Sequence, residues 1–140
     1  MPVVHSDAGK LASPEKLERI PALLSAYYTE YPDPKNPEQK VSFGTSGHRG
    51  SSLAQSFNEE HIFAIAQAVC DYRNMKGIDG PLYMGGDTHA LSEAAFRTAL
   101  ETLVANGVHV RVAKAGDHVA TPAVSHAILR HNEGKSQQLA

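Results

Sequence analysis

Apolar positions along this 140-residue chain follow two spacings, one typical of helices and one typical of strands. Stretches that begin near residues 13, 58, 92 and 121 repeat apolar side chains every three or four positions and are predicted helices. Between them, three short stretches are predicted strands, at residues 40–44, 81–85 and 108–112. The order helix, strand, helix, strand, helix, strand, helix predicts a layered α/β fold with a largely parallel sheet.

Capping residues mark where these helices should begin and end. Asn58 is placed to cap the second helix, and Gly77 follows its last turn. Ser13 and Thr121 each precede a proline, so we expect their hydroxyls to cap the first and last helices. Pro21 interrupts the first apolar stretch and predicts a break or a restart of the helix there.

Two units are predicted along the chain. Residues 1–39 form a helical arm and a stiff proline-rich linker, because three prolines alternate with polar residues between positions 32 and 37. Residues 40–140 form the α/β unit. In the arm, Tyr27, Tyr28 and Tyr31 could stack on a ligand, but packing of the helix onto the domain is the favoured interpretation.

Composition narrows the class of protein. With 41% apolar and 20% charged residues the chain suits a soluble globular domain. A formal net charge of −2 gives no basic field for nucleic acid or an anionic membrane, so any anion site must be local. Cys70 is the one cysteine and is predicted to be a buried structural thiol. Neither a long apolar run nor a signal-peptide pattern is present, which favours the cytoplasm.

The candidate chemistry is concentrated in residues 43–50, where three glycines, two hydroxyls, an imidazole and a guanidinium follow a predicted strand. Glycine permits the backbone conformations of a turn whose N–H groups surround an anion. Arg49 adds a planar fork that matches phosphate oxygens. From composition alone, a glycine-rich connector between strand and helix is the alternative interpretation.

Other chemistries fit less well. A serine-hydrolase elbow needs glycine two residues after the serine, but His48 stands there after Ser46. A Walker phosphate loop is absent, and the eight histidines show no metal-ligand spacing. Asp87, at the end of the second predicted strand, could act as an acid or base. We favour a role in fixing its own loop through backbone N–H groups.

Residues 43–50 resemble the first signature of the α-D-phosphohexomutases. This signature has histidine at position 48. Together with residues 58–62 and 86–92, it is similar to the motifs of the glucose-specific bacterial phosphoglucomutases of that family. The likeness extends from about Tyr27 to about Asn132, and its motifs are specific in combination. It implies a three-layer α/β/α domain I with a mostly parallel mixed sheet, present here in incomplete form.

The resemblance also implies an activity. Such enzymes are isomerases (intramolecular phosphotransferases) of carbohydrate metabolism that interconvert glucose 1-phosphate and glucose 6-phosphate. They use a phosphoserine, glucose 1,6-bisphosphate and Mg²⁺. Carried over by position, Arg49, Ser46 and His48 are the candidate catalytic residues, and Thr45, Ser46, Gly47 and Arg49 would bind phosphate. The implied partner is a small phosphosugar, with neither nucleic acid nor a membrane involved.

Three departures from the family pattern shape the expectation. Gly86 replaces a basic residue, and residues 118–122 vary around a Thr-Pro helix start. The family's phosphoserine loop and metal loop do not occur before Ala140. We therefore expect a phosphoglucomutase-like chain that is inactive alone and has no metal ligands of its own. The alternative is a non-catalytic phosphosugar- or partner-binding protein. A sheet that lacks its next strand would also leave an edge for self-association.

Overall fold

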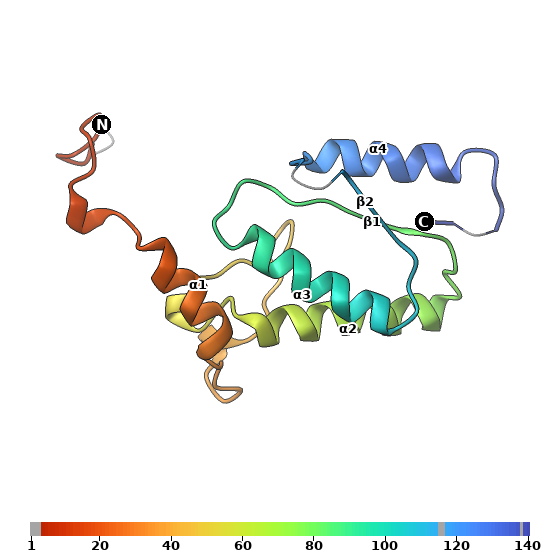
Figure 1. Cartoon of the computed structure of the whole chain (residues 1–140), viewed down its shortest axis with the longest axis horizontal. Coiled ribbons are helices and arrows are strands. Elements are labelled where there is room, and N and C mark those ends of the chain that lie inside the picture. The colour runs from red at the N-terminus through yellow and green to blue at the C-terminus, as the bar shows by residue number, and fades with distance from the viewer. Residues whose placement is uncertain (1–3, 115–116, 138) are drawn as a thin grey trace.

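The computed structural model describes residues 4–114, 117–137 and 139–140 and has an α/β/α architecture (Figure 1). The α-helices of the described chain are α1 (Ile20–Thr29), α2 (Glu59–Lys76), α3 (Ser92–Ala105) and α4 (Thr121–Asn132). Its strands are β1 (Leu82–Met84) and β2 (Val110–Val112). Helix α4 lies on one side of the strands and the packed pair α2 and α3 on the other, which confirms the predicted fold class (Figure 1).

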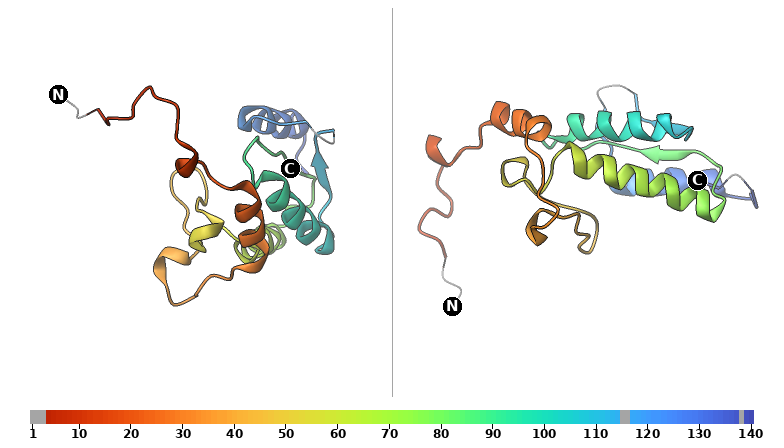
Figure 2. Two further views of the ribbon diagram at one scale, coloured as in Figure 1. Left: turned by 60° about the vertical axis from the view of Figure 1, so that its left-hand side comes forward. Right: turned by 90° about the horizontal axis from the view of Figure 1, so that it is seen from below.

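The two strands are parallel, with Leu82 paired to Val110 and Met84 to Val112. Because side chains alternate along a strand, Tyr83 and Arg111 point together to the opposite face. There the Arg111 guanidinium donates a hydrogen bond of 2.9 Å to the Tyr83 hydroxyl. In the right-hand view of Figure 2, seen from below, the green arrow of β1 appears between α3 and α2, with α4 behind α2. The parallel βαβ connection follows from the sequence order of strand, helix and strand.

The prediction of a strand at residues 40–44 is wrong. In place of a ladder with β1, this segment has one isolated antiparallel bridge, between Phe43 and His48. The chain reverses on itself within the glycine-rich turn, so the backbone of Phe43 pairs locally. Val41 and Phe43 consequently remain 37% and 64% exposed.

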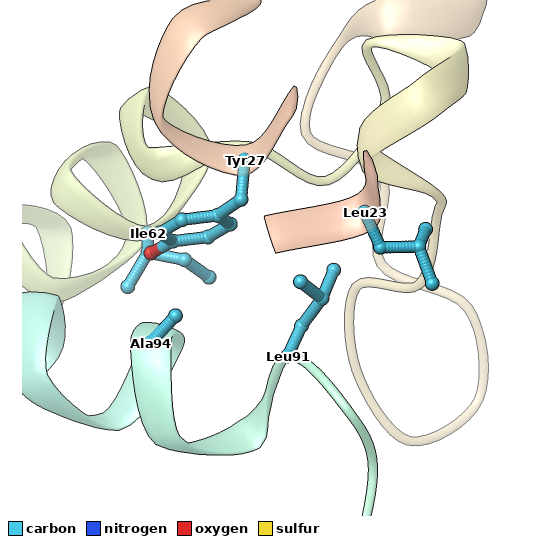
Figure 3. Close-up of a cluster of buried hydrophobic side chains, with 5 residues drawn as sticks. All are labelled: Leu23, Tyr27, Ile62, Leu91 and Ala94. Carbon is cyan, nitrogen blue, oxygen red and sulfur yellow. The ribbon is translucent and has the colours of Figure 1, made fainter. Parts of the chain in front are cut away.

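Helix α1 contributes to the same core as α2 and α3. The buried apolar cluster consists of Leu23, Tyr27, Ile62, Leu91 and Ala94, which Figure 3 shows converging from the three helices. The Tyr27 ring is fully buried, and its hydroxyl donates a 3.0 Å hydrogen bond to Thr98 Oγ1 on α3. Burial raises the pKa of Tyr27 to about 12. Packing of Tyr27 is thus confirmed, while Tyr28 and Tyr31 are 45% and 66% exposed.

Most of the helix boundaries follow the capping signals. Helix α1 restarts at Ile20 just before Pro21, Asn58 occupies the N-cap of α2, and Gly77 ends α2 with a positive φ of 64°. A position with φ in this range favours glycine, which explains why Gly77 stands at the end of the helix. The buried Asn58 amide group donates to the carbonyls of Ala26 and Ser52, at 2.8 and 3.2 Å. It thereby holds the start of α2 against the end of α1.

Two capping predictions are wrong. The N-cap of α4 is Ala120, so Thr121 is the first helical residue and its hydroxyl caps nothing. Ser13 precedes only a short 3₁₀ turn, Pro14–Lys16, and makes no side-chain cap. In both places proline fixes φ for the first turn, which suffices to start a helix without a hydroxyl acceptor.

The proline-rich linker is folded into turns and is less extended than predicted. The Lys35 amide donates to Asp33 Oδ1 at 2.8 Å, and a 3₁₀ turn follows at Pro37–Gln39.

On α2, the Cys70 thiol is buried and free as predicted, and burial raises its pKa. Among the described residues, no helix combines the length and apolar character needed to cross a bilayer.

Candidate functional site

The glycine-rich turn and the loop after β1 meet at one cavity of about 880 Å³. His48, Arg49 and Gly50 line one side of it, and Asp87 and His89 line the other. The deeper walls are apolar side chains of α2, α3 and β1. A concave site with an apolar interior and a few polar groups at its mouth is the usual form of a small-molecule site. Thr121, at the start of α4, completes the lining.

The turn presents unpaired backbone amides at its tip. The Gly44 N–H donates to the Gly47 carbonyl at 3.2 Å, which closes the turn. Gly47 has a φ of 142°, a conformation that side chains rarely adopt. Within the part of the chain that the structure describes, the amides of Thr45, Ser46 and Gly47 have no acceptor. Those three residues lie at the turn's tip and do not line the cavity.

Arg49 connects the tip to the mouth of the cavity. Its guanidinium donates a 3.0 Å hydrogen bond to Ser46 Oγ, and the residue itself lines the cavity and is exposed. A guanidinium cannot accept a proton, so this contact does not activate Ser46 as a nucleophile. It leaves the cation beside the free amides, which is an arrangement suited to binding an anion.

The His48 side chain packs against neighbouring parts of the protein and does not contact Ser46. Its Nδ1 lies 3.2 Å from both the N and the O atoms of Ser42. Its ring stacks on Phe57 and His61, with centroids 5.7 and 5.1 Å away. The buried Nε2 atom has no hydrogen-bond partner in the described structure. The imidazole therefore fixes the base of the turn.

His61 was not predicted as a site residue, yet its ring stacks on His48 and so supports the turn. It is only 3% exposed, accepts the Asn58 N–H at Nδ1 (3.1 Å) and reaches the Gln39 carbonyl with Nε2 (2.7 Å). One available signal was its position three residues after the helix cap, where a polar side chain can bond back to the cap amide. Its contact with His48 depends on the tertiary fold.

The loop after β1 is held by its own polar groups. Asp87 Oδ1 accepts the His89 N–H at 3.0 Å, and the Asp87 N–H donates to Ser92 Oγ at 3.1 Å. The pKa of the Asp87 carboxyl lies below its usual value, first because the carboxylate accepts the His89 N–H and then because the Ser92 side chain also hydrogen-bonds to it. The predicted loop-fixing role of Asp87 is confirmed. Leu91 is the N-cap of α3, so Ser92 is the first helical residue, and its hydroxyl bonds to the loop instead of capping the helix.

Replacing Ser92 with alanine should raise the pKa of Asp87 toward its ordinary value, because one bond to the carboxylate form is lost. The stability that Asp87 adds is present above its ordinary pKa and disappears as pH falls through the lowered value. In S92A this contribution should be smaller, and its loss should be complete at a higher pH. A ¹³C NMR titration of the Asp87 carboxyl measures the shift, and S92T, which keeps the hydroxyl, is the control. An unchanged pKa in S92A would assign the shift to His89 alone.

The described residues contain no ready-made metal centre. No group of three or more His, Cys, Asp or Glu side chains lies close enough together in them to hold a metal ion. Mg²⁺ itself binds oxygen ligands, usually one or two carboxylates together with substrate phosphates and water.

Comparison with known proteins gives two matches. Residues 40–136 match the sequence model of the family described as phosphoglucomutase/phosphomannomutase, alpha/beta/alpha domain I. The whole chain is 54% identical over 140 residues to a phosphoglucomutase of Komagataeibacter xylinus. It spans 25% of the length of that relative. Together with the α/β/α architecture, these matches show that the chain belongs to the phosphoglucomutase/phosphomannomutase family and carries its domain I.

Proposed function

We propose that this chain supplies a phosphate-binding part of a phosphoglucomutase, with Arg49 and the neighbouring amides holding the phosphate of a glucose phosphate. The observation that carries the proposal is the exposed Arg49 guanidinium at a cavity mouth, beside three backbone amides that find no acceptor among the described residues. Preorganised N–H donors and a guanidinium stabilise the charge that spreads over a transferring phosphoryl group. The 54% identical relative is a phosphoglucomutase, which supports the choice of sugar.

The reaction proposed for the whole protein is interconversion of glucose 1-phosphate and glucose 6-phosphate in the cytoplasm. A phosphoserine, glucose 1,6-bisphosphate and Mg²⁺ would take part. Because the chain covers a quarter of its relative, we assign only the binding role to it. Arg49 would orient the phosphate, the apolar walls would exclude water, and His48 would hold the turn in place.

Arg49→Ala should weaken binding of glucose 1-phosphate roughly tenfold or more, since a charge-assisted contact is lost. Isothermal titration of the full chain measures the affinity, and the melting temperature should stay close to that of the wild type because Arg49 is exposed. Arg97→Ala is the matched control, because that arginine is exposed on α3 and pairs with Glu93 at 3.0 Å. Equal affinity in R49A and R97A would contradict the proposal.

The second candidate function is non-catalytic binding of a phosphosugar or a partner. The contact that favours it is the one between Arg49 and Ser46, which gives the serine a cation and no base. With glucose 1-phosphate and glucose 1,6-bisphosphate supplied, we expect binding without turnover by this chain alone. Turnover that disappears in Ser46→Ala would instead indicate a small independent enzyme. Self-association through the unpaired edges of the two-stranded sheet stays a prediction.

A further inference from the structure

His61 contacts three parts of the structure: the start of α2, the segment before the glycine-rich turn, and the turn itself. Its Nδ1 accepts the N–H of Asn58 at the start of α2, and its Nε2 lies 2.7 Å from the Gln39 carbonyl. The face of its ring packs against His48 with the two planes only 19° apart. His61 itself does not line the cavity, so any influence on a ligand must pass through His48.

The hydrogen bonds of His61 specify one arrangement of its ring. The Asn58 N–H is a donor, so Nδ1 must accept and carries no proton. The Gln39 carbonyl is an acceptor, so Nε2 carries the proton and donates it. With both nitrogens bonded and the side chain buried, the ring is a fixed surface against which His48 can stack.

His48 transmits this constraint to the turn. Its Nδ1 lies against the backbone of Ser42, and Phe43 and His48 form the antiparallel bridge at the base of the turn. Arg49 is the next residue in the chain, so the orientation of the His48 backbone fixes where the Arg49 side chain starts. A shift of the His48 ring would therefore move the cation relative to the cavity.

We propose that His61 is a positioning residue for the phosphate site: it holds His48, and thereby the turn that carries Arg49, in its binding geometry. The coupling from His61 to the turn stands on the contacts above. The identity of the anion rests on the proposed function.

The test separates helix capping from loop positioning. In His61→Gln the side-chain oxygen can still accept the Asn58 N–H, since glutamine at this position completes a capping box. The ring against His48 is lost. We expect α2 to persist in H61Q while the ¹⁵N order parameters of residues 44–49 fall from about 0.85 to below about 0.6. Affinity for inorganic phosphate and for glucose 1-phosphate should fall roughly tenfold.

Tyr27→Phe is the control for general destabilisation. It removes the hydrogen bond to Thr98 but keeps the ring, and should lower the melting temperature without changing loop order or phosphate affinity. In the wild type, long-range ¹H–¹⁵N spectra should show His61 protonated on Nε2. The opposite tautomer would overturn the proposal.

Wild-type loop order and affinity in H61Q would also overturn it. If H61Q does not fold, His48→Ala tests the coupling between His61 and the turn, because it removes the same ring contact without altering the cap of α2. Loop residues that stay ordered in H48A would contradict the coupling. Failure of the wild type to bind either phosphate would count against the proposed function alone, since loop order is measured without ligand.

Discussion

Tyr27→Ala is expected to lower the free energy of unfolding by about 3–5 kcal/mol, the range for removing a buried aromatic side chain. The Tyr27 ring is fully buried between α1, α2 and α3 (Figure 3), so truncation leaves a cavity and removes one of the hydrogen bonds of the Thr98 hydroxyl. A domain of this size has only about 5–15 kcal/mol of stability, so the variant should be near its folding limit. Urea denaturation followed by circular dichroism measures the change.

Tyr31→Ala is the matched control, because this tyrosine is 66% exposed and its loss should cost no more than about 0.5 kcal/mol. Tyr27→Phe, which keeps the ring, should lie between the two variants at about 1 kcal/mol. If Y27A unfolded at the same urea concentration as Y31A, α1 would not belong to the cooperative core. The result therefore also tests whether residues 1–39 are a separate arm.

Gly50→Ala is expected to destabilise the chain by about 1–3 kcal/mol, because there is no room for a methyl group. A Cβ at this position would lie 2.6 Å from the carbonyl carbon of Ser56, so backbone would have to move. Since Gly50 follows Arg49, the same movement should displace the guanidinium and reduce affinity for glucose 1-phosphate. Denaturation and isothermal titration of one preparation measure both effects.

Gly44→Ala provides the comparison for Gly50. No atom lies within 4 Å of a Cβ built on Gly44, and its φ is not positive, so alanine should be tolerated there. Both substitutions add the same methyl group within the same turn. Equal stability of G50A and G44A would show that the contact between Gly50 and Ser56 does not constrain the turn.

Residues near one another in sequence made much of the fold predictable. Helix α2 begins after Asn58 and ends before Gly77 because caps and glycine act within one helical turn. The loop-fixing role of Asp87 could likewise be predicted, since its partner amide is two residues away. The local bridge formed at residues 40–44, in place of the predicted strand, could not be predicted. Alternating residues are compatible both with a sheet and with a local bridge.

The candidate site likewise has features that could be predicted from the sequence and features that could not. The position of Arg49 in a glycine-rich turn is a property of the sequence, but its bond to Ser46 and its place at the cavity mouth are not. His61 shows the limit most clearly. Its sequence position indicates a helix cap, whereas its stacking on His48 arises only when the turn folds back over α2.

By itself, the sequence determined the helices, the parallel strand pair and the segment that carries the anion-binding chemistry. These depend on periodicity, capping and glycine conformations, which act over a few residues. Only the tertiary structure decided that Tyr27 is buried in the core while Tyr28 and Tyr31 stay exposed. It also decided that residues 40–44 form no strand and that His48 stacks on His61 instead of contacting Ser46. Those outcomes depend on which of several compatible contacts buries the most surface and bonds the most polar groups, a competition that involves the whole chain.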